Sequence, residues 1–398
     1  MVRKISDSII YIGTDDFSDP LFENQYDLPD GMSFNSYLIK DAKTAILDSS
    51  DSRTAEEWKE NLLEALEGVE PDYFVVHHIE PDHSALIPWL AERFPALQFV
   101  ASAKALQMVP QFYPEVNLEG RSLAVKEGDV LELGAHSLKF FMAPMVHWPE
   151  VVMSYEQKEK ALFSADAFGK FGALSRRGFD SSEDEDWACE ARRYYFNIVG
   201  KYGGPVQTVL KKLSALEIAT ICPLHGPVLK DDLSEYLRLY NIWSSYGVES
   251  EGVFVACASI HGNTLKAAEK FADMLREKGV KVAFADLTRD DQAEAVEDAF
   301  RYGTLVLAAS SYDAGLFPPA AEFISHLQDK AWQNRRVGLI ENGSWAPSAG
   351  RVMKERFAAM KNVTILEPLV TIRSSMKDSD LPAMQALSES VIAQPGLA

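Results

Sequence analysis

The chain contains few cysteines and no C-x-x-C pair. Only Cys189, Cys222 and Cys257 occur in 398 residues, and they lie far apart in the sequence. An odd number of widely spaced cysteines encodes neither a disulfide framework nor a rubredoxin-type iron site. We therefore interpret all three as buried thiols.

Long apolar runs and dense basic stretches are also absent. No apolar run approaches the length of a membrane span, and the first residues lack the apolar core of a signal peptide. The formal net charge of −20 and the absence of a Lys/Arg stripe disfavour nucleic acid as a partner. These absences predict a cytoplasmic protein that binds neither membrane nor nucleic acid.

The amino-acid composition and the length of the chain predict a folded protein with two domains. Apolar residues make up 47% and charged residues 25%, as in average globular proteins. A length of 398 residues exceeds the size at which a single core usually stops growing. Residues 1–248 mix strand and helix patterns as in a layered α+β domain, whereas residues 252–398 alternate strand and helix as in a doubly wound parallel sheet.

Local patterns predict particular strands and helices in both halves of the chain. Alternating apolar residues predict a strand over Ser33–Ile39, and helical spacing predicts one helix over Asp184–Val199. In the second half, the apolar run Thr364–Val370 predicts the last strand of the parallel sheet.

Potential metal ligands follow several predicted strands. His78, Glu80, Asp82 and His83 stand within six residues of a loop that leaves a buried strand. Later strands lead into the ligand types His147, Asp166 and His225. The first cluster alone could be a solvated loop, but the further ligand types at the ends of later strands favour a metal site. Several of its donors are oxygen atoms, which suit iron better than zinc.

The motifs H-x-E-x-D-H, H-W-P, S-A-D and P-L-H-G resemble the metallo-β-lactamase superfamily, whose first motif is H-x-H-x-D-H. In this chain Glu80 replaces the second histidine. Followed by a flavodoxin-like pattern, the series is similar to the flavodiiron proteins over essentially the whole chain. The resemblance implies a metallo-β-lactamase-like αββα sandwich followed by an α/β flavodoxin-like doubly wound parallel sheet.

The resemblance also implies a ligand set for two irons. One iron would be held by His78, Glu80 and His147, the other by Asp82, His83 and His225, with Asp166 bridging them. Tyr195 matches a family tyrosine near the metal pocket that donates a hydrogen bond or proton. Alternatively, Tyr195 is a helix residue whose aromatic side chain only packs against its neighbours.

Three loops of the second half are expected to bind FMN. The first opens a helix with hydroxyls and backbone amides suited to phosphate, and the other two follow later strands at the same sheet edge. Turn chemistry alone also explains each loop separately. The expected FMN contacts are Ser259, Ile260, His261, Gly262, Asn263, Thr264, Ser311, Tyr312, Asp313, Ala314, Gly315, Asn342, Gly343, Ser344 and Trp345, with Tyr312 and Trp345 able to stack on the flavin.

Together these features predict an FMN-dependent diiron oxidoreductase that reduces O2 to water, NO to N2O, or both. Reduced FMN and two ferrous ions store the four electrons that one O2 requires. The expected partners are a separate electron donor, namely a rubredoxin-like protein, a flavin reductase or reduced deazaflavin, and a second copy of the chain in a head-to-tail homodimer or a dimer of dimers. The alternatives are a dizinc hydrolase with a flavodoxin-like accessory domain and a redox sensor or electron carrier with a degenerate site.

Overall fold

A computed structural model describes residues 1–184 and 186–393 of the chain. The chain folds into two compact units, Met1–Asn241 and Ile242–Ala398, which are described separately below. The domain limits expected from the sequence, 1–248 and 252–398, remain a prediction.

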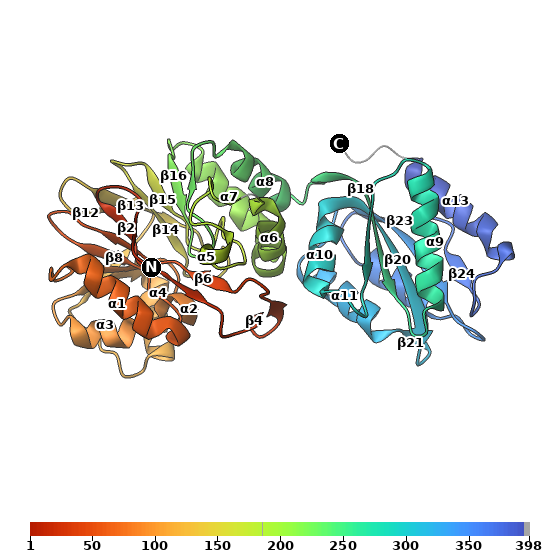
Figure 1. The fold of residues 1–398 in the computed structure, drawn as a ribbon, viewed down its shortest axis with the longest axis horizontal. Helices are drawn as coiled ribbons and strands as arrows, with labels where there is room; N and C mark the ends of the chain where they lie inside the picture. The colour runs from red at the N-terminus through yellow and green to blue at the C-terminus, as the bar shows by residue number, and fades with distance from the viewer. Residues whose placement is uncertain (185, 394–398) are drawn as a thin grey trace. The chain divides into compact units, whose positions relative to one another are not determined.

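Two sheets pack face to face in the first unit (Figure 1). The first sheet has the order β1 (Arg3–Lys4), β2 (Ile9–Tyr11), β7 (Tyr37–Ile39), β8 (Ala45–Leu47), β9 (Tyr73–Val76), β10 (Gln98–Ser102) and β11 (Ser122–Val125). The second has the order β12 (Val130–Glu132), β13 (Ser137–Met142), β14 (Val152–Glu156), β15 (Ala161–Phe163), β16 (Thr220–Cys222) and β17 (Leu229–Lys230).

Alternation along the strands separates the two apolar layers of this unit. On β8, Ala45 and Leu47 point into the core between the sheets, whereas Ile46 joins the cluster on the outer face. Helices α1 (Ala55–Leu66), α3 (Ile87–Arg93) and α4 (Ala103–Phe112) contribute to that outer cluster, and α7 (Gly203–Leu213) contacts β13 of the other sheet. The predicted αββα sandwich is therefore confirmed.

The direction of the strands brings the motifs that carry the predicted metal ligands to one end of the sandwich. β13 and β15 are both antiparallel to β14, and β15 is parallel to β16, so the carboxyl ends of β13, β15 and β16 share one edge. The backbone N–H of Val152 donates to the carbonyl of His77 at 3.0 Å, which ties the end of β9 in the other sheet to the same edge.

Two predicted elements of the first unit are interrupted. The expected strand over Ser33–Ile39 is split into β6 (Met32–Phe34) and β7, because Asn35 donates its backbone N–H to Leu224 and its side-chain amide to Pro223 and Gly226 instead of joining a ladder. The expected helix over Asp184–Val199 begins at Trp187 as α6 (Trp187–Tyr194), with Asp186 as its cap, and continues as a π-helical turn, η2 (Tyr195–Val199).

The second unit is a parallel sheet with the order β19 (Val282–Asp286), β18 (Ser250–Ala258), β20 (Tyr302–Tyr312), β22 (Arg335–Asn342) and β23 (Val363–Ile365). Helices α9 (Asn263–Glu277) and α13 (Leu381–Ile392) cover one face, and α10 (Gln292–Arg301) and α11 (Pro318–Asp329) lie on the other (Figure 1). This is the flavodoxin-like strand order, as predicted.

The last predicted strand, Thr364–Val370, is two short strands. β23 pairs with the first residues of β22, whereas β24 (Val370–Ile372) pairs with its last residues. The residues between them leave the ladder, and β24 carries the chain to Ser374 at the carboxyl edge of the sheet.

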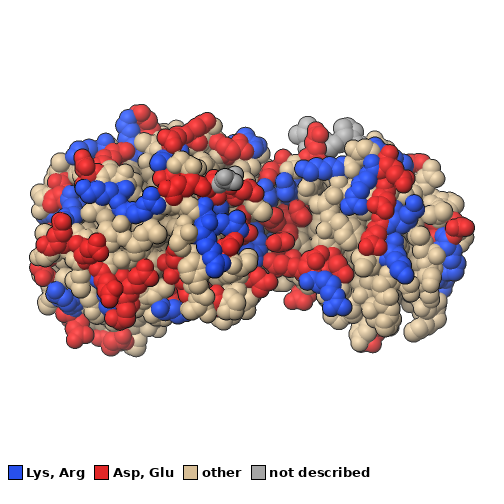
Figure 2. Space-filling model, viewed as in Figure 1, with Lys and Arg blue, Asp and Glu red and all other residues tan. Residues whose placement is uncertain are grey.

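The surface and the cysteines can be compared with the sequence predictions, and one cysteine differs from its prediction. No helix in residues 1–184 and 186–393 is both long and apolar enough to cross a membrane. On the face drawn in Figure 2, basic side chains are interspersed with acidic ones. Cys222 and Cys257 are buried as expected, but Cys189 is exposed because it lies on an outward position of α6.

Candidate metal centre and flavin pocket

Four predicted ligands form one compact group at the edge of the sandwich. Nε2 of His78 lies 3.0 Å from Oε2 of Glu80, and Nε2 of His147 lies 3.2 Å from the same oxygen. Oδ2 of Asp166 is 3.0 Å from Nε2 of His147 and 3.6 Å from that of His78. Donor atoms of these four residues all lie within 4.8 Å of one another, as a shared metal ion requires.

The other three predicted ligands form a second group beside the first. Oδ2 of Asp82 lies 3.3 Å from Nε2 of His83 and 3.4 Å from Nε2 of His225. Oδ1 of Asp166 lies 3.2 Å from Nε2 of His83. The two oxygens of Asp166 therefore face different histidine groups, which is the arrangement of a carboxylate shared between two metal ions.

Several buried polar atoms in these groups lack a hydrogen-bond partner among the described residues. They are both carboxylate oxygens of Asp82, Oδ1 of Asp166, both ring nitrogens of His83 and Nε2 of His225. Leaving so many buried polar atoms unpaired is costly, so a bound group is needed to satisfy them. The donor set of four imidazoles and three carboxylates fits two iron ions.

In the metal-free site, histidines and carboxylates lie side by side and shift each other's pKa values. Burial alone would lower the pKa of His147, but hydrogen bonds to Asp166 and Glu80 outweigh burial and raise this pKa to about 9. Burial would raise the pKa of Asp166, whereas the neighbouring histidines hold it well below its usual value. At neutral pH the metal-free protein therefore holds protons on its histidines that a metal must displace.

The apparent metal affinity should consequently depend on pH. Because His147 is protonated below about pH 9 without metal, raising the pH from 7 to 9 should strengthen binding by ~10-fold per unit for each displaced proton. Titration with Co²⁺ at several pH values, followed by absorbance, measures this slope. A pH-independent affinity over this range would contradict the proposed role of His147.

His77 does not join either ligand group. Its Nδ1 lies 2.5 Å from Oδ2 of Asp48, and its Nε2 lies 2.7 Å from Oγ of Ser154 on β14. Both ring nitrogens are thus occupied, and the side chain is buried. His77 therefore connects the two sheets beneath the metal-binding loop.

The tyrosine beside the ligands is Tyr194, the neighbour of the predicted Tyr195. The Tyr194 ring lies 5.6 Å from that of His225, and its buried hydroxyl has no hydrogen-bond partner in the described part of the chain. Burial, followed by the carboxylates of Asp166, Asp82 and Glu80, raises the pKa of Tyr194. Tyr195 instead packs against Phe196 and Tyr240. Sequence reasoning could not separate the two because the exact phase of the helix decides which one faces the ligands.

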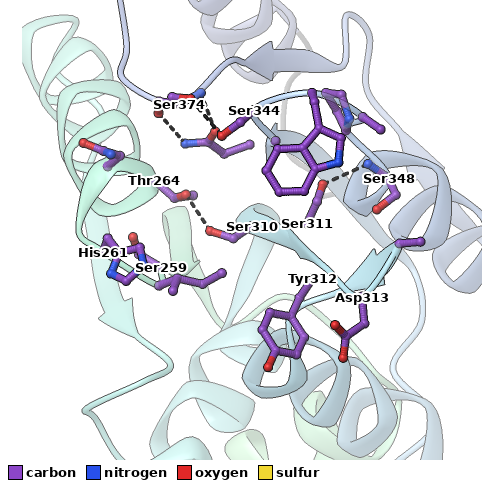
Figure 3. Close-up of a pocket in the computed structure, with 18 residues that line it drawn as sticks. Ser259, His261, Thr264, Ser310, Ser311, Tyr312, Asp313, Ser344, Ser348 and Ser374 are labelled. Atoms are coloured by element: carbon purple, nitrogen blue, oxygen red, sulfur yellow. Dashed lines mark hydrogen bonds between the residues drawn. The ribbon is translucent and has the colours of Figure 1, made fainter.

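The second unit contains a cavity of about 760 Å³ at the carboxyl edge of its sheet (Figure 3). All three predicted loops line it, including Ser259, Tyr312 and Trp345, although Gly262 and Gly315 do not. The sequence prediction missed five lining residues: Ser310, Ala346, Pro347, Ser348 and Ser374. Of these, Ser374 had a usable signal, because it follows a strand that ends at the same edge.

Hydrogen bonds between loops shape this pocket (Figure 3). The hydroxyls of Thr264 and Ser310 lie 2.8 Å apart, and Ser374 donates to Ser344 at 2.8 Å. The hydroxyl of Ser311 accepts the backbone N–H of Ser348 at 2.8 Å, just before helix α12 (Ala349–Ala358). The pocket therefore combines a polar floor with the N-terminus of α9, which suits a phosphate group.

Comparison with known proteins agrees with this architecture. The family profile described as ODP family beta lactamase matches residues 32–226. The chain is 27% identical over 395 residues to a nitric oxide reductase from Moorella thermoacetica, covering 98% of both chains. A solved variant of the flavo di-iron protein from Thermotoga maritima aligns with a TM-score of 0.89 at 25% identity, covering 98% of each chain. The rubredoxin oxygen:oxidoreductase from Desulfovibrio gigas shares the fold, with a TM-score of 0.91 at 22% identity and 99% coverage of both chains.

Fold and site define a metallo-β-lactamase-like domain joined to a flavodoxin-like domain. Within that class, the matches along nearly the whole chain are to a nitric oxide reductase and to a flavodiiron protein. These relatives are named as oxidoreductases.

Proposed function

We propose that this chain is a flavodiiron protein that reduces O2 to water, NO to N2O, or both, with electrons delivered through FMN. The observation that carries the proposal is the position of Asp166, whose two oxygens face two separate groups of ligands. A pair of metals sharing one carboxylate leaves positions open for a small diatomic substrate.

The residues proposed to hold one iron are His78, Glu80 and His147, and those proposed for the other are Asp82, His83 and His225, with Asp166 shared. When bound, the two irons supply electrons and open coordination positions for the substrate. The protein contributes a buried, preorganised ligand set in which backbone and side-chain hydrogen bonds fix two of the imidazoles.

A second cavity gives substrate a path to the ligands. It has a volume of about 350 Å³, and its walls include Glu80, Asp82, Phe22 and Phe34. Most of its other wall residues are polar or charged, so Phe22 and Phe34 provide the apolar part of this path for O2 or NO, both of which are small and weakly polar. Because reduction of either substrate consumes protons, the hydroxyl of Tyr194 is better placed than that of Tyr195 to donate a hydrogen bond or proton into the site.

The cavity of the second unit is proposed to bind FMN. Its volume lies within the range of cofactor sites, and the loop Ser259–Thr264 opens α9 as a phosphate site would. Tyr312 and Trp345 are large aromatic residues at its rim, and the Trp345 side chain is 89% exposed. An exposed tryptophan at a cavity rim is explained if it stacks on the flavin ring.

Replacing Trp345 with alanine should therefore weaken FMN binding without destabilising the protein. Loss of one stacking contact should raise the FMN dissociation constant by ~10-fold. The free energy of unfolding of the flavin-free protein should change by less than about 0.5 kcal/mol, because the side chain is exposed. Quenching of FMN fluorescence measures the affinity. F17A, which truncates an exposed ring outside this pocket, is the control and should leave FMN affinity unchanged.

Electron transfer requires short distances, and the two proposed cofactors lie in different units of the chain. We therefore propose a head-to-tail homodimer, or a dimer of dimers, in which the FMN of one copy serves the irons of another. A separate donor, either a rubredoxin-like protein, a flavin reductase or reduced deazaflavin, would reduce the FMN. A monomer that turned over rapidly at micromolar concentration, in light scattering and activity measurements, would contradict the dimer.

The proposed function is tested first by cofactor content. Elemental analysis and the visible spectrum of the purified protein should give two irons and one FMN per chain, and the reduced protein should consume NO or O2 in an anaerobic cell fitted with the corresponding electrode. Zinc without flavin, together with hydrolysis of esters or phosphodiesters, would replace this proposal with the dizinc hydrolase.

A further inference from the structure

The two proposed iron sites have matching sets of direct ligands. Each contains two imidazoles and one carboxylate, and both share Asp166. A difference between the irons can therefore arise from the groups that contact the ligands. These groups differ in charge.

On one side, His78 is bonded to a buried carboxylate. Its Nδ1 lies 2.6 Å from Oε1 of Glu150, which also accepts the backbone N–H of Ile79 at 3.1 Å. Because Nε2 of His78 faces the metal group, Nδ1 carries the proton and donates it to Glu150. The Glu150 side chain is fully buried, and its Oε2 has no partner within residues 1–184 and 186–393.

On the other side, neither histidine bonds to a carboxylate through Nδ1 in the described part of the chain. Nδ1 of His225 donates to the backbone carbonyl of Ser33 at 2.7 Å, which is a neutral acceptor. Nδ1 of His83 has no partner in the described structure. Among the described residues, no carboxylate is bonded behind the second ligand group as Glu150 is behind the first.

We propose that Glu150 is a positioning residue that orients His78 and makes the iron held by His78, Glu80 and His147 the more easily oxidised of the two. The inference rests on the proposed diiron function. A buried carboxylate that accepts the Nδ1–H of a ligating histidine makes the opposite nitrogen a stronger donor. Its negative charge also stabilises Fe³⁺ more than Fe²⁺, and burial weakens the screening of that charge.

The experiment compares two buried Glu-to-Gln substitutions in the iron- and FMN-loaded protein. E150Q removes the charge behind His78. E156Q is the matched control, because Glu156 is also fully buried and lies 3.0 Å from Nδ1 of His136, a histidine outside both ligand groups. A third variant, E150D, retains the negative charge if E150Q folds poorly.

Redox titration with mediators, monitored by Mössbauer spectroscopy of ⁵⁷Fe, resolves the two one-electron oxidations of Fe²⁺ to Fe³⁺. In E150Q the step at lower potential should become ~10-fold less favourable, which is about 59 mV for one electron. Iron affinity, measured by chelator competition, should fall by ~10–100-fold. E156Q should change neither quantity, and E150D should lie nearer to the wild-type potential than E150Q.

Equal effects of E150Q and E156Q, or a shift confined to the step at higher potential, would overturn the role of Glu150 while leaving the diiron function intact. A wild-type protein that binds no iron would overturn the proposed function itself. The two failures are therefore distinguishable.

Discussion

Replacement of Asp166 with asparagine is expected to destroy the paired metal site. The carboxylate is the one side chain in the described structure that faces both ligand groups, and an amide has only one acceptor oxygen to offer. Mutation of a residue that hydrogen-bonds to a metal ligand lowers the metal affinity by ~10–100-fold. Loss of a ligand shared by two metals should therefore lower the iron affinity by at least ~100-fold. Elemental analysis should find fewer than two irons per chain, and NO and O2 consumption should fall at least in proportion.

The matched control for this variant is D180N. Asp180 is also buried in the first unit, but it pairs with Lys230 at 2.8 Å and belongs to neither ligand group. The D180N protein should retain both irons. Full iron occupancy in D166N would show that Asp166 is not a shared ligand.

Replacement of Arg335 with methionine is expected to destabilise the second unit. The guanidinium is buried and donates to the carbonyls of Phe300, Tyr246 and Gly247, and also to those of the two residues that precede it. Burial lowers the pKa of Arg335 to about 10. The methionine would leave these carbonyls without their donor, so the free energy of unfolding should fall by about 3–5 kcal/mol.

Scanning calorimetry of the R335M protein should show a transition roughly 10 °C lower, since each kcal/mol shifts the midpoint by roughly 2–4 °C in a domain of this size. The neighbouring Arg336 provides the control. It is only partly buried and donates to Thr304 and Val391, so R336M should cost less than about half as much. Equal losses from the two variants would contradict the importance of the Arg335 carbonyl contacts.

Much of the architecture was predictable from the sequence because it depends on local patterns. The alternation of apolar residues predicted strands such as β8, and the alternation of strands with helices predicted the doubly wound sheet of the second unit. The ligand types were also predictable, because His78, Asp166 and His225 each follow a strand, and strands of one direction end at one edge.

Elements that depend on contacts with distant residues were not predictable in the same way. Asn35 interrupts the strand expected over Ser33–Ile39 because it bonds to the loop at Pro223 and Gly226, nearly two hundred residues away. The strand expected over Thr364–Val370 is divided because two parts of it pair with different parts of β22. Neither pairing leaves a signal in the local apolar pattern.

By itself the sequence determined which side chains are candidates for binding metal and phosphate, since this choice depends on residue type and on position at a strand end. Only the tertiary structure decided how they are combined. It directs the two oxygens of Asp166 to different histidine groups, places Tyr194 rather than Tyr195 against His225, and puts Glu150 behind His78. These choices depend on the phase of one helix and on the packing of two sheets, both of which are set by contacts between residues far apart in the chain.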